Sequence, residues 1–143
     1  MNLASHLMSA GSVSARGAVV AIVAVMLAGC SAANADSVTL DLMPLNDSGV
    51  SGTVRLSALD GDSTLVVIEV DPAGHLNMPG HVHPGTCADL VPQPKYALES
   101  VRNGQSRTEV AASLEDLLAG GQAINLHLSN EQMDVYSACV DLS

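Results

Sequence analysis

Two histidines separated by one residue, His81 and His83, have the clearest potential for chemistry in this sequence. The residues around them favour a β-strand, and side chains two positions apart on a strand point to the same face of the sheet. Imidazole is a natural ligand of copper and zinc, so a pair on one face could bind a metal. The pair could equally be two solvated or hydrogen-bonded side chains, and the pattern alone leaves both interpretations open.

A third imidazole, His127, lies in a later segment with the same strand periodicity. Within residues 124–128 the apolar side chains alternate with Asn125 and His127, which predicts that His127 projects away from the core. Taken alone, His127 could simply cap the end of a strand. If it joins His81 and His83, the three ring nitrogens must lie within about 5 Å of one another, because metal bonds to nitrogen are about 2 Å long. Three such nitrogens from two strands would leave a coordination position open.

Short β-prone runs separated by turn residues must position these side chains. Most of the runs alternate apolar and polar residues with the two-residue period of a half-buried strand. Turn sequences such as Asp60-Gly61-Asp62 separate them. The expected strands cover residues 37–43, 53–59, 63–70, a stretch near 81, and residues 98–102, 107–112, 122–128 and 135–142.

Other parts of the chain predict a loop and a single helical turn. Prolines at positions 84, 92 and 94 indicate a loop after the histidine pair. Residues 113–120 have a serine cap, an acid three residues later and a glycine stop, which is typical of a short helix. The sequence therefore predicts an all-β fold, a Greek-key β-sandwich or flattened barrel of about seven or eight antiparallel strands with one short helical turn.

The N-terminal residues resemble an export signal. The thirteen-residue apolar run 17–29 follows Arg16 and is too short to span a bilayer, which needs about 20 residues. Leu-Ala-Gly-Cys, ending at Cys30, resembles the bacterial lipobox, whose cysteine becomes the lipid-modified first residue of the mature protein. We therefore expect a lipoprotein signal peptide over 1–29, a lipidated tether over 30–36 and a domain over 37–143. The alternative is an ordinary secreted protein in which Cys30 is a free thiol.

On this interpretation the domain lies in the cell envelope, outside the cytoplasm, and is anchored to a lipid bilayer through Cys30. Beyond residue 29 the chain has four basic and fifteen acidic residues, a formal charge of −11. Nucleic acid is then excluded as an expected partner, because phosphate binding needs clustered Lys and Arg.

The remaining cysteines, Cys87 and Cys139, could form a disulfide outside the cytoplasm. The sequence has no Phe or Trp and only two Tyr, so its small core side chains bury little area each and the domain would benefit from a cross-link. Closing a loop of this length contributes about 4 kcal/mol by loop-closure entropy. Metal binding by these sulfurs is less favoured, because they lie far apart in sequence without a Cys-x-x-Cys grouping.

Three short segments, taken in order, resemble those of a copper/zinc superoxide dismutase domain. They are Gly80-His81-Val82-His83, the strand that ends at His127, and Cys87 with the later Ala138-Cys139. The resemblance implies copper ligands at His81, His83 and His127, a disulfide between Cys87 and Cys139, and dismutation of superoxide. Copper is favoured over zinc because it binds such nitrogen sites more tightly.

The sequence also departs from that family. No histidine lies between Cys87 and His127, so the family's zinc site and its fourth copper ligand are missing. The arginine that attracts superoxide is replaced by Tyr136, and another cation would have to lie near the metal, the candidates being Lys95, Arg102 and Arg107.

These departures leave alternatives open for the ligands and for the function. His75 and Met78 could complete a copper shell, although His75 is more simply explained as a spare loop histidine. Three functions remain: a superoxide dismutase-like copper protein, a non-catalytic protein that binds or buffers copper ions, and a metal-free structural or interaction module. A zinc site of three histidines with bound water ranks below copper.

Overall fold

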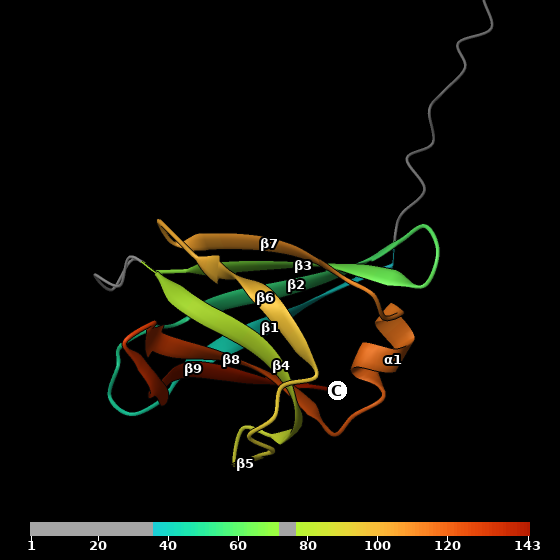
Figure 1. Cartoon of the computed structure of the whole chain (residues 1–143). Helices are drawn as coiled ribbons and strands as arrows, with labels where there is room; N and C mark the ends of the chain where they lie inside the picture. Colours follow the sequence, from blue (N-terminus) through green and yellow to red (C-terminus); the bar gives the residue numbers. More distant parts are fainter. Residues whose placement is uncertain (1–35, 72–76) are drawn as a thin grey trace, which may run out of the picture. The chain divides into compact units, whose positions relative to one another are not determined.

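A computed structural model of the chain describes residues 36–71 and 77–143 (Figure 1). The predicted signal peptide, Cys30, the tether up to residue 35 and His75 lie outside the described residues. No helix within the described ranges is long and apolar enough to cross a membrane. The described residues form β1 (Ser37–Pro44), β2 (Gly52–Leu59), β3 (Ser63–Val70), β4 (Met78–Thr86), β5 (Asp89–Leu90), β6 (Tyr96–Val101), β7 (Gln105–Val110), α1 (Leu114–Leu118), β8 (Gln122–Ser129) and β9 (Gln132–Leu142).

The strands form a curled antiparallel sheet, which confirms the predicted all-β class. Hydrogen bonding joins them in the order β4-β8-β9-β1-β2-β3-β7, and both β5 and β6 pair with β4. β6 and β7 form a tight hairpin, closed by the bridge between Arg102 and Gln105, so the two ends of the sheet approach each other. Because β4, β6 and β7 follow one another and β8 returns beside β4, the connection is a Greek key.

The curled sheet has two layers, one of β1, β2, β3 and β7 and the other of β4, β6, β8 and β9. Between β1 and β9 the ladder is short, with Met43 opposite Cys139 and Pro44 opposite Ala138. The buried core is aliphatic, as the composition requires, and takes side chains from both layers. The largest fully buried side chains include Leu42, Leu56, Ile68, Met78, Leu117, Ile124, Leu126 and Leu142.

Helix α1 confirms the predicted helical turn, and its N-cap Ser113 accepts a hydrogen bond from the Asp116 amide at 3.0 Å. The strands differ from the prediction mainly around Pro84, which was expected in a loop. β4 continues through Pro84, which lies opposite Gln122, and the Pro84 carbonyl accepts from the Val91 amide at 2.9 Å. Proline has no backbone N–H to donate, but its carbonyl can still accept a ladder hydrogen bond. The strand can therefore continue through Pro84 towards β5.

Candidate metal centre

β4 and β8 place all three predicted ligands on one face of the sheet. The strands are antiparallel neighbours in which His81 lies opposite Asn125. Val82 is fully buried in the core, so its neighbours His81 and His83 lie on the outer face of β4. His127, two residues beyond Asn125, is on the same face and diagonal to His81. The sheet register therefore brings together side chains that are more than forty positions apart in sequence.

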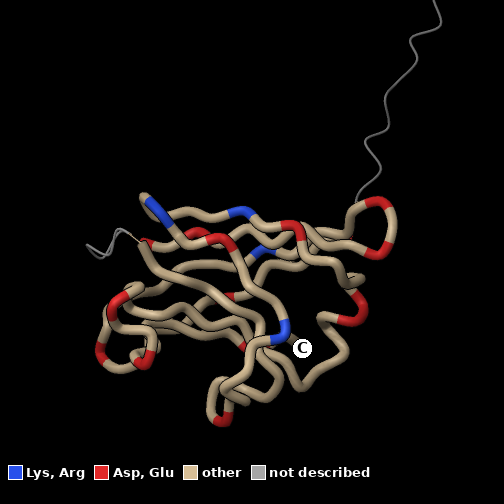
Figure 2. Tube along the Cα trace, viewed as in Figure 1, with Lys and Arg blue, Asp and Glu red and all other residues tan. Residues whose placement is uncertain are grey.

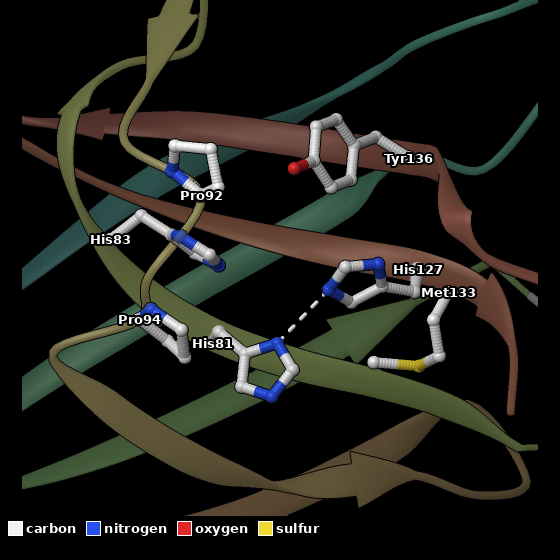
Figure 3. Close-up of a pocket in the computed structure, with 7 residues that line it drawn as sticks. All are labelled: His81, His83, Pro92, Pro94, His127, Met133 and Tyr136. Carbon is white, nitrogen blue, oxygen red and sulfur yellow. Dashed lines mark hydrogen bonds between the residues drawn. The ribbon is translucent and has the colours of Figure 1, made fainter.

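The ring nitrogens of His81, His83 and His127 converge closely enough to hold a metal ion. One ligand atom from each lies within 4.8 Å of the other two. His81 Nδ1 and His127 Nε2 are 2.9 Å apart (Figure 3). Two nitrogens bound to one ion at about 2.0–2.1 Å and about 90° apart are separated by about 2.9 Å, and nitrogens on opposite sides by about 4.2 Å. A movement of under about 1 Å would therefore let all three nitrogens bind a single ion.

A backbone carbonyl fixes the orientation of the His83 ring and the position of its Nδ1 proton. Its Nδ1 lies 2.7 Å from the Val91 carbonyl oxygen, which can only accept, so Nδ1 carries the proton and donates. In the neutral ring Nε2 therefore holds the lone pair, and this nitrogen is buried with no hydrogen-bond partner among the described residues. A metal-binding histidine commonly donates its other ring N–H to a backbone carbonyl in this way. The unpartnered Nε2 is therefore the observation that best fits a metal ligand at this position.

His127 does not cap the end of a strand, which was the alternative explanation for it. β8 continues to Ser129, so His127 lies within the strand, and its side chain is only 5% exposed. The reason is the β8–β9 hairpin, which places the ring of Tyr136 against His127 at a centroid distance of 5.1 Å. The side chain of His127 lies on the face of β8 opposite to that of the core residue Leu126, as the alternation in residues 124–128 predicted.

Burial lowers the pKa of both His81 and His127 below the usual 6.5. For His81, the proximity of His127 and His83 lowers the pKa further. For His127, the Met133 backbone raises the pKa and His83 lowers it, both less than burial does. Both rings are therefore neutral at neutral pH, which is the form that binds metal.

We expect the metal-free domain to lose stability as the pH falls below about 6.5. Above this value, both rings are neutral whether the chain is folded or unfolded, while below it the unfolded chain takes up protons that the folded one resists. Urea unfolding between pH 7.5 and 5 measures this loss. A His81→Gln/His127→Gln variant should show a shallower dependence. A free energy of unfolding that stays constant or rises towards pH 5 would contradict the lowered pKa values.

The three histidines open into a cavity of about 420 Å³, and none of the described residues that line it is an Asp, Glu, Lys or Arg. The other lining residues are Pro92, Pro94, Met133 and Tyr136 (Figure 3). Acidic residues outnumber the few Lys and Arg along the described trace (Figure 2).

The cations considered for attracting superoxide lie outside that lining. Lys95 follows Pro94, but its ammonium group donates to Gln122 Oε1 at 3.1 Å and lies 5.4 Å from the Tyr96 ring centroid. Arg102 and Arg107 belong to the β6–β7 hairpin and to β7.

Cys87 and Cys139 lie at disulfide-bonding distance, with their Cα atoms 5.8 Å apart. Cys87 starts the segment that leads through β5 to Val91 and Pro94, and its amide donates to Asp141 Oδ1 at 2.6 Å. The cross-link therefore attaches this segment to β9. Since Val91 supplies the carbonyl that orients His83, the cross-link also supports the metal centre.

Several site residues were not predicted from the sequence. Met133, Pro92 and Pro94 line the cavity, and Val91 contributes a backbone carbonyl, which carries no sequence signal. Met78, considered as an extra ligand, is instead in the core with 1% exposure, because its place in β4 puts it on the same face as Val82. Comparisons of this chain with protein families, with curated proteins and with solved structures find no match.

Proposed function

We propose that this protein is an exported, membrane-anchored copper-binding protein with a site of the superoxide dismutase type. The single observation that supports it most is the buried lone pair of His83 Nε2. An acceptor buried without a partner costs about 1–3 kcal/mol, and an ion shared with the neighbouring His81 and His127 would remove that cost. The ligand atoms are then His81 Nδ1, His83 Nε2 and His127 Nε2.

Copper is the metal that best fits this set of donors. Three neutral imidazoles suit copper and zinc, and copper binds nitrogen donors more tightly. His81 Nδ1 and His127 Nε2 share a hydrogen bond of 2.9 Å, so they already lie close enough to bind one ion together. Zinc remains the weaker competitor at the same site.

Dismutation of superoxide is the second candidate function, and the open cavity beside the histidines favours it. Bound copper would supply one-electron chemistry, by which two superoxide ions and two protons become dioxygen and hydrogen peroxide. The protein's own contribution is positional: the Val91 carbonyl fixes the tautomer and orientation of His83, and the half-buried His81 borders the cavity through which a small molecule would enter. Holding or buffering copper needs the same three ligands without turnover.

The proposal is tested by copper stoichiometry of the purified domain from residue 37 onwards. We expect one copper per chain in competition with a chelator, and none in His81→Ala/His83→Ala. The matched control is Asn77→Ala, which should keep one copper per chain, since Asn77 precedes β4 and does not line the cavity. Failure of the unaltered domain to bind copper would refute the proposal. Superoxide consumption by the loaded form then separates turnover from copper holding.

The proposed export and anchoring rest on the Leu-Ala-Gly-Cys sequence that ends at Cys30. A disulfide between Cys87 and Cys139 is consistent with an oxidising compartment outside the cytoplasm. In fractionated cells, the full chain is expected with the membrane and Cys30→Ser in the soluble fraction. Equal membrane association of both chains would contradict the lipid anchor.

A further inference from the structure

Met133 is a sulfur-bearing side chain that borders the three histidines without belonging to the core. It is the second residue of β9, lines the cavity and is 40% exposed. In the close-up its thioether lies on the same side as the rings of His81 and His127 and extends towards His81 (Figure 3). Core packing therefore does not explain why a large apolar residue occurs at position 133. A role beside the three histidines would explain it.

The β8–β9 hairpin holds Met133 beside the site. Ser129 pairs with Gln132 directly before Met133, and the Glu131 amide donates to Ser129 Oγ at 3.2 Å. On the far side of Met133, the Tyr136 carbonyl accepts from Asn46 Nδ2 at 2.9 Å. The strand is thus paired just before and just after the irregular stretch that contains Met133, and rotation about its flexible side-chain bonds can move the sulfur.

A thioether changes which form of copper the site prefers. Sulfur of this kind is a soft ligand that binds Cu(I) well and is only a weak, long ligand of Cu(II). Among the described residues that line the cavity, Met133 is the one soft donor beside the three nitrogens. Tyr136 and the prolines offer no comparable donor.

We propose that Met133 Sδ is a fourth ligand that joins His81, His83 and His127 when the copper is Cu(I), so that the site selects reduced copper. This inference depends on the proposed copper-binding function. It gives the uncharged rim a role, because capture of a soft cation needs no positive charge at the entrance.

The test is Met133→Leu, which keeps an apolar side chain of similar volume and removes the sulfur. Cu(I) affinity, measured by competition with a Cu(I)-specific chelator, is expected to fall about tenfold, while Cu(II) affinity stays within about twofold. X-ray absorption of the Cu(I)-loaded domain should contain a copper–sulfur contribution that Met133→Leu lacks. The matched control is Met43→Leu on β1, which is 61% exposed and not part of the cavity lining.

The possible failures can be told apart. If the unaltered domain binds Cu(I) without a copper–sulfur contribution, or if Met133→Leu keeps full Cu(I) affinity, the role of Met133 is refuted while the three-histidine site stands. If the unaltered domain binds no copper in either oxidation state, the proposed function itself fails. Thermal unfolding of Met133→Leu should match the unaltered domain, since the side chain is outside the core.

Discussion

Replacing both Cys87 and Cys139 with serine is expected to lower the free energy of unfolding by about 4 kcal/mol and copper affinity by about 10- to 100-fold. The stability loss follows from the 52 positions between the cysteines, since a cross-link of that span strongly restricts the unfolded chain. The affinity loss follows from Val91, whose carbonyl fixes the proton on His83 and lies on the segment that the disulfide attaches.

Affinity should fall rather than vanish in the serine variant, because two backbone hydrogen bonds also hold the Val91 segment to β4. The Val91 amide donates to the Pro84 carbonyl at 2.9 Å, and the Lys95 amide donates to the Val82 carbonyl at 2.8 Å. Urea unfolding and copper competition, both at a temperature where the variant is folded, measure the two effects. Val91→Ala is the control, since it keeps the carbonyl and removes only an exposed side chain. Unchanged copper affinity in the serine variant would show that the disulfide does not support the site.

The sequence predicted the strands well where local chemistry decides them. Period-two alternation located β1, β2 and β8 nearly to the residue, and the serine cap with its following acid located α1. Prediction failed at Pro84, where an available carbonyl outweighed the loop-forming tendency of proline. It also missed β5, whose two residues pair with β4 only because the chain turns back there.

The three histidines could be proposed as a set from their spacing and their resemblance to a known pattern, but their surroundings could not. The burial of His127 depends on a hairpin that turns Tyr136 onto it, and no periodicity in β8 encodes that contact. Met133 reaches the site because β9 begins at Gln132, three residues before the strand that the sequence indicated. Long-range placement of this kind arises from sheet register, which a single sequence specifies only weakly.

Replacing Tyr136 with arginine is expected to raise the rate constant for superoxide consumption by the copper-loaded domain about tenfold. Tyr136 lines the cavity, where the described lining residues include no Lys or Arg, and the chain beyond residue 29 has a formal charge of −11. A positive charge about 6 Å from an approaching anion contributes roughly 0.7–2.8 kcal/mol for an effective dielectric constant of about 80 to 20, or about 3- to 100-fold in rate. Stopped-flow measurement of superoxide decay gives the rate constants.

Salt dependence makes this prediction specific to electrostatics. With Tyr136 in place, added salt should speed the reaction by screening repulsion between the acidic domain and superoxide, whereas in Tyr136→Arg the trend should flatten or reverse. Tyr136→Gln is the matched control, because it also removes the ring that packs against His127 but adds no charge. A similar rate increase in Tyr136→Gln would assign the effect to better access. No increase in Tyr136→Arg, in a domain that still binds copper, would show that superoxide attraction does not limit this site and would favour copper holding over turnover.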